Sequence, residues 1–419
     1  MNRQKLSKSE RAWILYDVGN SAFILLVSTI IPVYYDTLAG NAGISSVDYL
    51  ATWGYAASIA TLIAAAAGLV LGGMSDQKGY KKRLFAACMA LGAAACGALG
   101  LARTWQCFLV IFVIARIGYA DSLVCYDAML PDITVGERMD RVSSYGYAWG
   151  YIGSCIPFGV CLWLSLGHGT LGIPLVAAMA AVFLITALWW AASSILLLKQ
   201  YRQVHFAEEG GRPVRDSLKR LGQTFLQVKK QKHIFVFLLA FFFFIDGVYA
   251  IIDMATAYGT ALGLDTAGLL IALLATQFVA FPFSILFGRL AGKYPAGRLI
   301  AVCIIAYLGI AVYAVFLKTQ AQFYVLAVCV GMFQGGIQSL SRSYYAKLIP
   351  AEQAGEYFGL FDICGKGASF LGTFLIGLVS QMTGSMNLGV GAMAVIFGIG
   401  LVLLLRADRL AKDWREANQ

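Results

Sequence analysis

Two long apolar runs of this chain are joined by the stretch Gly72-Gly73-Met74-Ser75-Asp76-Gln77-Lys78-Gly79-Tyr80-Lys81-Lys82-Arg83. A partial copy in the second half of the chain, also between two apolar runs, reads Gly288-Arg289-Leu290-Ala291-Gly292-Lys293-Tyr294-Pro295-Ala296-Gly297-Arg298. Loops of the same kind at corresponding places in two halves are typical of a membrane bundle that arose by duplication. We therefore expect an all-α membrane protein made of two six-helix bundles.

The composition agrees with a membrane protein. Hydrophobic residues make up 59% of the 419 residues and charged residues only 13%, unlike a soluble domain. This length accommodates about twelve spans of ~20 residues each. The net charge of +10 is better explained by cations held on the inner side of a membrane than by nucleic-acid binding, which we do not expect.

The apolar runs set the expected topology. Each is long enough to cross a bilayer, and they cover residues 13–35, 52–71, 83–101, 106–130, 143–166, 171–198, 234–257, 267–290, 298–317, 322–346, 356–380 and 385–405. Nearly all Lys and Arg residues fall on one side of these spans, the exceptions being Arg103, Arg116, Lys318 and Lys366. The positive-inside rule then predicts that both termini are cytoplasmic.

One long connection divides the chain. We expect a first bundle over residues 1–198, a cytoplasmic linker over 199–233 and a second bundle over 234–419. The linker places apolar residues at helical spacing, which predicts an amphipathic helix lying on the inner leaflet. They are Val214, Leu218, Leu221, Phe225 and Val228. A regulatory role of the linker is the alternative.

Charged side chains inside the spans are the candidate functional residues, because each one is costly in a bilayer. At 1.5 Å of rise per residue, Arg116 lies about 15 Å and Asp246 about 18 Å into their spans, near the membrane centre. Unless they pair only with each other, these two should line a wet cavity. The candidates for binding the substrate or a proton are Asp17, Asn20, Arg116, Asp121, Asp127, Asp246, Asp253, Gln334, Gln338 and Arg342.

Other polar residues are candidates for a conformational latch. Asp76 could be a solvated loop carboxylate, but its position between helix ends favours a latch, with Arg138 and Arg141 of the next inner loop as candidate partners. Asp362 and Lys366 are four residues apart on one helical face, so simple mutual neutralisation competes with a gating role. The latch candidates are Gly72, Asp76, Gly79, Lys81, Lys82, Arg138, Arg141, Asp362 and Lys366.

The loop Gly72-x-Met74-Ser75-Asp76-x-x-Gly79-x-Lys81-Lys82 resembles the signature of the major facilitator superfamily. In the second-half copy, Gly292 replaces the acid and Pro295 the glycine. Within the superfamily, the chain resembles the vacuole-effluxer family, which comprises autophagy-related vacuolar amino acid exporters and their bacterial relatives. The stretches that carry this resemblance are 13–23, 126–132, 244–249, 334–343 and 358–366. Where relatives commonly have Asn, this chain has Asp127.

The resemblance implies a central cavity lined by helices one, four, seven and ten, which opens alternately to each side of the membrane. The charged candidates from Asp17 to Arg342 fall on those four helices, where a wet cavity would be needed. An Arg can bind a carboxylate with two hydrogen bonds, and a buried Asp can carry a proton. We hypothesise that Asp246 binds a substrate amine or carries the proton, and that Arg116 or Arg342 binds the anionic end.

The predicted function is secondary transport of a small polar solute by alternating access. The resemblance implies efflux of amino acids, and a buried Asp that can carry a proton suggests proton coupling. A sugar, nucleoside or drug transporter of the same fold is the alternative, and a non-transporting receptor or scaffold a more distant one. No catalytic or nucleotide-binding motif is present, and scattered cysteines and histidines predict no metal site. We expect no enzyme activity and no cofactor, and a monomer in a bacterial inner membrane.

Overall fold

The computed structural model describes the whole chain except residues 1–4, 208–223, 225, 262 and 418–419. In the described part, twelve helical segments are long and apolar enough to cross a membrane. The expected number of spans is therefore confirmed. Their orientation relative to the cytoplasm stays a prediction.

The spans are mostly single long helices. Ser28 and Thr29 interrupt the first span between α1 and α2, and Ala392 separates α15 from α16 in the last. The first half contains α1 (Lys8–Val27), α2 (Ile30–Asn41), α3 (Ser46–Ser75), α4 (Tyr80–Ala98), α5 (Trp105–Ala128), the short α6 (Leu130–Ile133), α7 (Arg138–Gly167) and α8 (Leu175–Gln200). The second half contains α10 (Lys232–Ala261), α11 (Thr266–Leu290), α12 (Ala296–Val315), α13 (Gln320–Ala346), α14 (Ala354–Thr383), α15 (Met386–Gly391) and α16 (Met393–Ala417).

Local sequence signals fix several helix ends. Ser7 and Glu10 form a capping box at the start of α1, and Thr319 and Gln322 form another at the start of α13. Gly79 precedes α4 with φ of 79°, a left-handed conformation that glycine adopts without strain. The polar loop of the sequence therefore ends in a turn that aims α4 back into the bundle.

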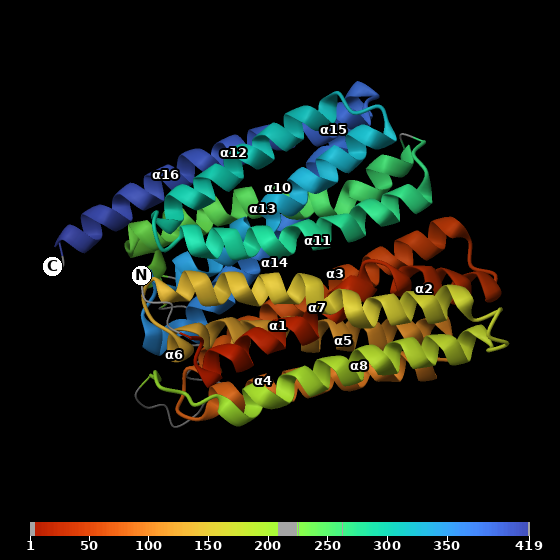
Figure 1. Ribbon diagram of the computed structural model, residues 1–419, viewed down its shortest axis with the longest axis horizontal. Coiled ribbons are helices and arrows are strands. Elements are labelled where there is room, and N and C mark those ends of the chain that lie inside the picture. The colour runs from red at the N-terminus through yellow and green to blue at the C-terminus, as the bar shows by residue number, and fades with distance from the viewer. Residues whose placement is uncertain (1–4, 208–223, 225, 262, 418–419) are drawn as a thin grey trace.

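The two halves form two stacked groups of helices, with red-to-green helices below and green-to-blue helices above in Figure 1. Across the boundary, α3 packs against α14, α7 against α11 and α13, and α5 against α14. Both termini lie at the same end of the bundle, at the left of Figure 1. We call this the basic end, because the loops at residues 76–79 and 291–295 belong to it.

The glycine-rich face of α7 allows close packing in the first half. A side chain on Gly150 would meet the Ser21 hydroxyl at 2.8 Å, and one on Gly153 would meet Val18 at 2.5 Å. Both contacts are with α1, so small residues here let the two backbones approach. Pro157 lies within α7, which continues through it.

The predicted amphipathic helix of the linker falls largely on residues 208–223 and 225, outside the described part of the chain. Its last member, Val228, is described, and it is buried in a helical segment over 226–230. The first linker residues, 201–207, run in extended form over the loop that carries Asp76, where Ala207 N donates to Asp76 O at 2.8 Å.

Candidate functional site

Arg342 of α13 joins the two halves near the basic end. Its Nη2 lies 3.3 Å from Asp17 Oδ2 of α1, and its Nη1 lies 3.1 Å from Asp127 Oδ1 of α5. Its Nε donates to Ser143 Oγ of α7 at 2.9 Å, and Nη2 also donates to Ser143 O at 3.1 Å. One second-half guanidinium is thus bound by three first-half helices. It is 3% exposed, so the two carboxylates replace its lost hydration.

Aromatic rings complete the Arg342 site. The Cζ of the guanidinium lies 4.5 Å from the ring centroids of both Trp13 and Tyr147, a distance at which each ring makes a cation–π contact. A side chain on Gly146 would meet Asp17 Oδ2 at 2.2 Å, so only glycine leaves room for that carboxylate. Sequence reasoning identified Arg342, Asp17 and Asp127 separately, and the structure brings them together.

Three uncharged candidates lie on the same two helices. Asn20 is buried and its side-chain amide lies 3.5 Å from Asp17 Oδ1, at the outer limit of a hydrogen bond. Gln334 is buried, and its Nε2 has no partner among the described residues. Gln338 is half-buried one turn closer to Arg342. These residues offer hydrogen bonds between the Arg342 site and the middle of the bundle.

Arg116 and Asp253 are a second pair of opposite charges on different halves. Arg116 lies at the midpoint of α5 and is half-buried, while Asp253 of α10 is exposed. Their charges interact electrostatically, but the described residues give neither side chain a hydrogen bond or a salt bridge within 4.0 Å. The two opposite charges therefore lie on different halves without a direct ion pair in the described part of the chain.

Asp246 lies against another helix of its own half. Its Oδ1 accepts from Gly372 N of α14 at 2.8 Å, and Oδ2 has no partner among the described residues. A side chain on Gly372 would come within 3.0 Å of both carboxylate oxygens. The structure therefore does not bring Asp246 together with Arg116, and the two side chains do not neutralise each other's charge by direct contact.

Asp76 accepts two backbone hydrogen bonds from the second half. Its Oδ1 binds Gly355 N at 2.7 Å and its Oδ2 binds Glu356 N at 2.9 Å, in the first turn of α14. A helix N-terminus favours such a carboxylate. Burial is the largest influence and raises the Asp76 pKa from 3.8 to about 7, against the opposing effects of Lys81 and the two amides.

The partners expected for Asp76 were wrong. Arg138 instead forms a salt bridge with Glu10 at the start of α1, and Arg141 lies 5.3 Å from the ring centroid of Tyr145 one turn along α7. Arg138 is the first residue of α7, and it pairs with Glu10 of the α1 capping box. Asp76 accepts instead from backbone amides of α14 in the other half. A backbone partner has no signature in side-chain charge, so the sequence could not indicate it.

Gly72 makes the Asp76 contact sterically possible. A side chain there would meet Gly355 O at 2.3 Å, and one on Gly355 would meet Gly72 O at 2.2 Å. The backbones of α3 and α14 are therefore in contact at Gly72 and Gly355, next to the hydrogen bonds that Asp76 accepts. We call the contacts of Gly72 and Asp76 with Gly355 and Glu356 the α3–α14 latch.

Lys81 and Asp132 connect the start of the linker to the α3–α14 latch through ion pairs and hydrogen bonds. Lys81 is buried, lies 4.0 Å from Asp76 and 3.3 Å from Asp132, and donates to Ala128 O at 3.1 Å. Asp132 also accepts from the Tyr201 hydroxyl at 2.5 Å and from His205 N at 2.8 Å. Sequence reasoning did not select Asp132, although it stands in the stretch 126–132. Lys82 is half-buried and forms no ion pair or hydrogen bond through its side chain in the described part of the chain.

Asp362 and Lys366 form the expected salt bridge on α14. Asp121 of α5 reaches the same place, because a side chain on Gly68 of α3 would lie 3.4 Å from Asp121 Oδ1 and 3.5 Å from Asp362 Oδ2. Asp121 Oδ1 has no hydrogen-bond partner in the described part. Asp121 does not contact the Lys366 ammonium, but its charge interacts electrostatically with both Lys366 and Asp362.

Further polar contacts cross the boundary at the basic end. Lys347 Nζ lies 2.7 Å from Asp140 Oδ2, and Ser343 Oγ donates to Asp140 Oδ1 at 2.6 Å. Ser143 Oγ donates to Ser339 O at 2.7 Å. Sequence reasoning missed these residues because nothing in their spacing distinguishes them from ordinary helix ends. Together with Arg342 and the α3–α14 latch, they close the basic end.

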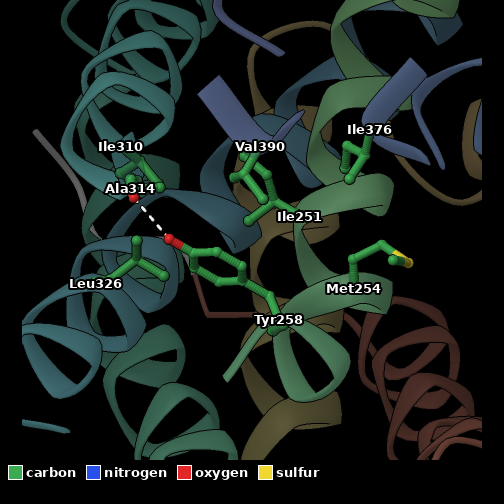
Figure 2. A pocket seen from close by; sticks show the side chains of 9 residues that line it. Ile251, Met254, Tyr258, Ile310, Ala314, Leu326, Ile376 and Val390 are labelled. Carbon is green, nitrogen blue, oxygen red and sulfur yellow. Dashed lines mark hydrogen bonds between the residues drawn. The ribbon is translucent and has the colours of Figure 1, made fainter. Parts of the chain in front are cut away.

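An apolar pocket lies within the second half (Figure 2), and Tyr258 donates to Ala314 O beside it at 2.6 Å. The pocket is lined by Ile251, Met254, Ala255, Tyr258, Ile310, Ala314, Leu326, Ile376 and Val390. It presents no charged group, so we do not assign a polar substrate to it. Among the described residues, no three metal-ligating side chains are grouped to hold an ion.

Comparisons with solved structures show the fold. The chain is similar to the major facilitator superfamily transporter FucP in the outward conformation, with a TM-score of 0.74 and 13% identity over 96% of this chain and 97% of that one. It is also similar to the human organic anion transporter MFSD10, with a TM-score of 0.68 and 14% identity over 95% and 99% of the two chains. The structure is therefore a major facilitator fold.

Comparisons of sequence show the family. The family model described as "Vacuole effluxer Atg22 like" matches residues 6–417. The uncharacterized MFS-type transporter YxiO of Bacillus subtilis is 39% identical over 96% of this chain and 95% of its own length. Autophagy-related protein 22-1 of Penicillium rubens is 27% identical over 64% of this chain, which corresponds to 49% of the fungal protein. The chain therefore belongs to the vacuole effluxer family and is a multi-pass membrane transporter of the major facilitator superfamily, not an enzyme.

Proposed function

We propose that this transporter moves amino acids across a bacterial inner membrane by alternating access, with proton coupling. The observation that carries the proposal is the pair Arg116 and Asp253, which place opposite charges on the two halves without direct contact. A free amino acid carries a carboxylate and an ammonium group, so it can bridge the two. Arg116 offers two-pronged hydrogen bonding to the carboxylate, and Asp253 is the acceptor for the ammonium group.

The Arg342 site is assigned to closure rather than to the first substrate contact. Its guanidinium is already bound by Asp17, Asp127 and Ser143, and it makes cation–π contacts with two aromatic rings. A substrate carboxylate would have to displace one of these partners. Arg342 therefore forms the ion pairs that close the basic end. Arg116 is then the remaining candidate for binding the substrate's anionic group.

Alternating access requires contacts that can be broken at moderate cost. The cross-half contacts of the described residues at the basic end are ion pairs and hydrogen bonds, which water can replace when the halves separate. Substrate bound between Arg116 and Asp253 would draw the two halves together at the end of the bundle opposite the basic end. The bundle would then rock about the substrate, as expected for this fold.

The test is uptake by purified protein in liposomes, with radiolabelled amino acids, sugars and nucleosides compared at two pH values. We expect uptake of amino acids, and Arg116→Gln should reduce it by on the order of a hundredfold because a charged hydrogen-bonded partner is lost. Arg103→Gln is the matched control, since Arg103 is exposed at the opposite end. Uptake of sugars or nucleosides alone, or full activity of Arg116→Gln, would contradict the proposal.

A further inference from the structure

We propose that Asp121 and Asp362 form a proton-binding site that exists only while the two halves are closed at the basic end. The inference rests on the proposed function, because it names the group that would couple proton movement to the conformational change. Asp121 belongs to α5 in the first half, and Asp362 belongs to α14 in the second. The site is therefore assembled and dismantled by the same motion that moves a substrate.

The geometry places one oxygen of each carboxylate against the same position on α3, and the two charges interact electrostatically. Asp121 Oδ1 and Asp362 Oδ2 are 3.4 and 3.5 Å from the same point, the position a Cβ of Gly68 would occupy. Asp121 is 2% exposed, and Oδ1 has no hydrogen-bond partner among the described residues. An ionised carboxylate left in this state is costly, since nothing replaces its hydration.

The charges around the pair leave room for one proton. Lys366 is one cation for two carboxylates, and it contacts Asp362 one turn away on the same helix. The other titratable groups that interact with Asp121 are the thiols of Cys88 on α4 and Cys125 on α5. Asp362 also interacts with Cys364 of its own helix, with Tyr249 of α10 and with Asp127 of α5, and Asp127 is already paired with Arg342. From α3, the contact is the backbone of Gly68. One added proton would neutralise the cluster and give Asp121 a hydroxyl that can donate toward Asp362.

Separation of the halves would reverse this state. Lys366 stays with Asp362 because both belong to α14, and that pair remains neutral. Asp121 stays on α5, loses the neighbouring carboxylate and gains water, so its ionised form becomes favourable. The proton then leaves Asp121 as a hydrated proton on the side to which the basic end has opened. Asp121 is therefore the carrier, and Asp362 is the group that makes it bind a proton in the closed state.

The first test separates coupling from transport in liposomes that hold the purified transporter. The probe is the radiolabelled amino acid with the largest uptake in the panel above. We expect Asp121→Asn to reduce accumulation driven by a pH gradient by at least about tenfold, while exchange of labelled for unlabelled amino acid stays within about twofold. Exchange needs no net proton movement, so it also shows that the variant is folded. Asp36→Asn, an exposed carboxylate on α2, is the matched control.

A second test needs no substrate, so it distinguishes a wrong coupling site from a wrong substrate. Infrared difference spectra between acid and neutral pH report buried protonated carboxyl groups. In an Asp76→Asn background, which removes the latch carboxylate, we expect a carboxyl band that disappears in both Asp121→Asn and Asp362→Asn. If no carboxyl band is removed by both substitutions, the proposal is overturned, and it is overturned as well by loss of gradient-driven uptake in Asp246→Asn but not in Asp121→Asn.

Lys366→Gln tests the direction in which the pH midpoint of uptake should move. Without the ammonium, the two carboxylates should bind their shared proton more tightly, so the pH of half-maximal gradient-driven uptake should rise by about one unit or more. A lysine that only neutralises Asp362 as a structural pair would lower uptake at every pH without this displacement. A pH profile that keeps its midpoint would therefore also overturn the proposal.

Discussion

At the scale of single residues, charges that are isolated in the sequence lie together in the structure. Arg342 alone would be costly in a membrane, but Asp17, Asp127 and Ser143 supply acceptors in the plane of the guanidinium. Trp13 and Tyr147 add cation–π contacts to the same group. A lysine could not reproduce this arrangement, because a single ammonium lacks the guanidinium's several fixed N–H donors, which bind three partners at once.

Arg342→Gln should destabilise the closed transporter. The substitution leaves the buried Asp17 and the half-buried Asp127 without their cation, and removing one partner of a buried pair costs on the order of 3–5 kcal/mol. We expect a lower melting temperature in detergent and loss of uptake. Arg289→Gln, on an exposed arginine of α11, should leave both unchanged. Equal melting temperatures for the two variants would contradict this account of Arg342.

Much of the fold could be predicted from the sequence, because apolar runs of span length have few alternatives in a membrane. The candidate residues on the four central helices were also predictable, since a charge in a span needs a reason. Their pairing was not. Asp76 binds backbone amides of a helix 279 residues away, and Asp121 meets Asp362 over a glycine of a third helix. Such contacts depend on how the two halves dock, which periodicity does not encode.

At the scale of helices, glycines determine which pairs can touch. Gly72 and Gly355 bring the backbones of α3 and α14 into contact beside Asp76, and Gly146 admits the Asp17 carboxylate between α1 and α7. These glycines serve close approach rather than flexibility, since Gly72, Gly146 and Gly355 all lie within helices. The signature loop is therefore as much a packing surface as a charged one.

Gly72→Ala should weaken closure of the basic end. The added methyl group would lie 2.3 Å from Gly355 O, so α14 must shift and the amides would move away from Asp76. We expect the closed population to fall and uptake to slow severalfold, by analogy with the cost of overpacking a close contact. Labels on the two halves at the basic end would measure the population. Gly309→Ala is the control, because nothing lies within 4 Å of that site. An unchanged closed population in Gly72→Ala would contradict the steric role.

Asp132→Asn should release the start of the linker from the first half. Asp132 accepts hydrogen bonds from Tyr201, Val204 and His205 as well as from Lys81, and an amide can satisfy only part of this set. We expect faster tryptic cleavage at Arg202, which is exposed in this segment. Glu352→Gln, on an exposed residue before α14, should cleave at the rate of the unmodified protein. Equal cleavage rates in all three proteins would show that Asp132 does not hold the segment.

At the scale of the whole molecule, the polar contacts between the halves gather near the basic end. They comprise the Arg342 site, the α3–α14 latch, and the contacts of Asp140 with Lys347 and Ser343. Arg116 and Asp253 lie apart from these contacts and do not touch. This distribution describes a transporter closed at one end, with a pair of free charges available to a ligand. The latch adds a dependence on pH, because its carboxylate is buried by closure.

Closure of the α3–α14 latch should weaken as the pH rises toward neutrality. Burial raises the pKa of Asp76 from 3.8 to about 7 in the closed state, whereas a hydrated Asp76 in the open state keeps its ordinary value. The closed state therefore binds the proton more tightly, and protonation favours closure. The closed fraction should be greatest below about pH 4, fall between about pH 4 and 7, and stay constant above.

Pulsed electron resonance between spin labels at Arg83 and Lys293, both exposed at the basic end on different halves, would measure this dependence. The labels should be attached through unnatural amino acids, because nine native cysteines are free. In Asp76→Asn the latch group no longer titrates, so the change in closed fraction between pH 4 and 7 should shrink, leaving only the part contributed by Asp121. In the double variant Asp76→Asn, Asp121→Asn it should vanish. A pH dependence that keeps its full size in the double variant would assign proton-linked closure to neither carboxylate.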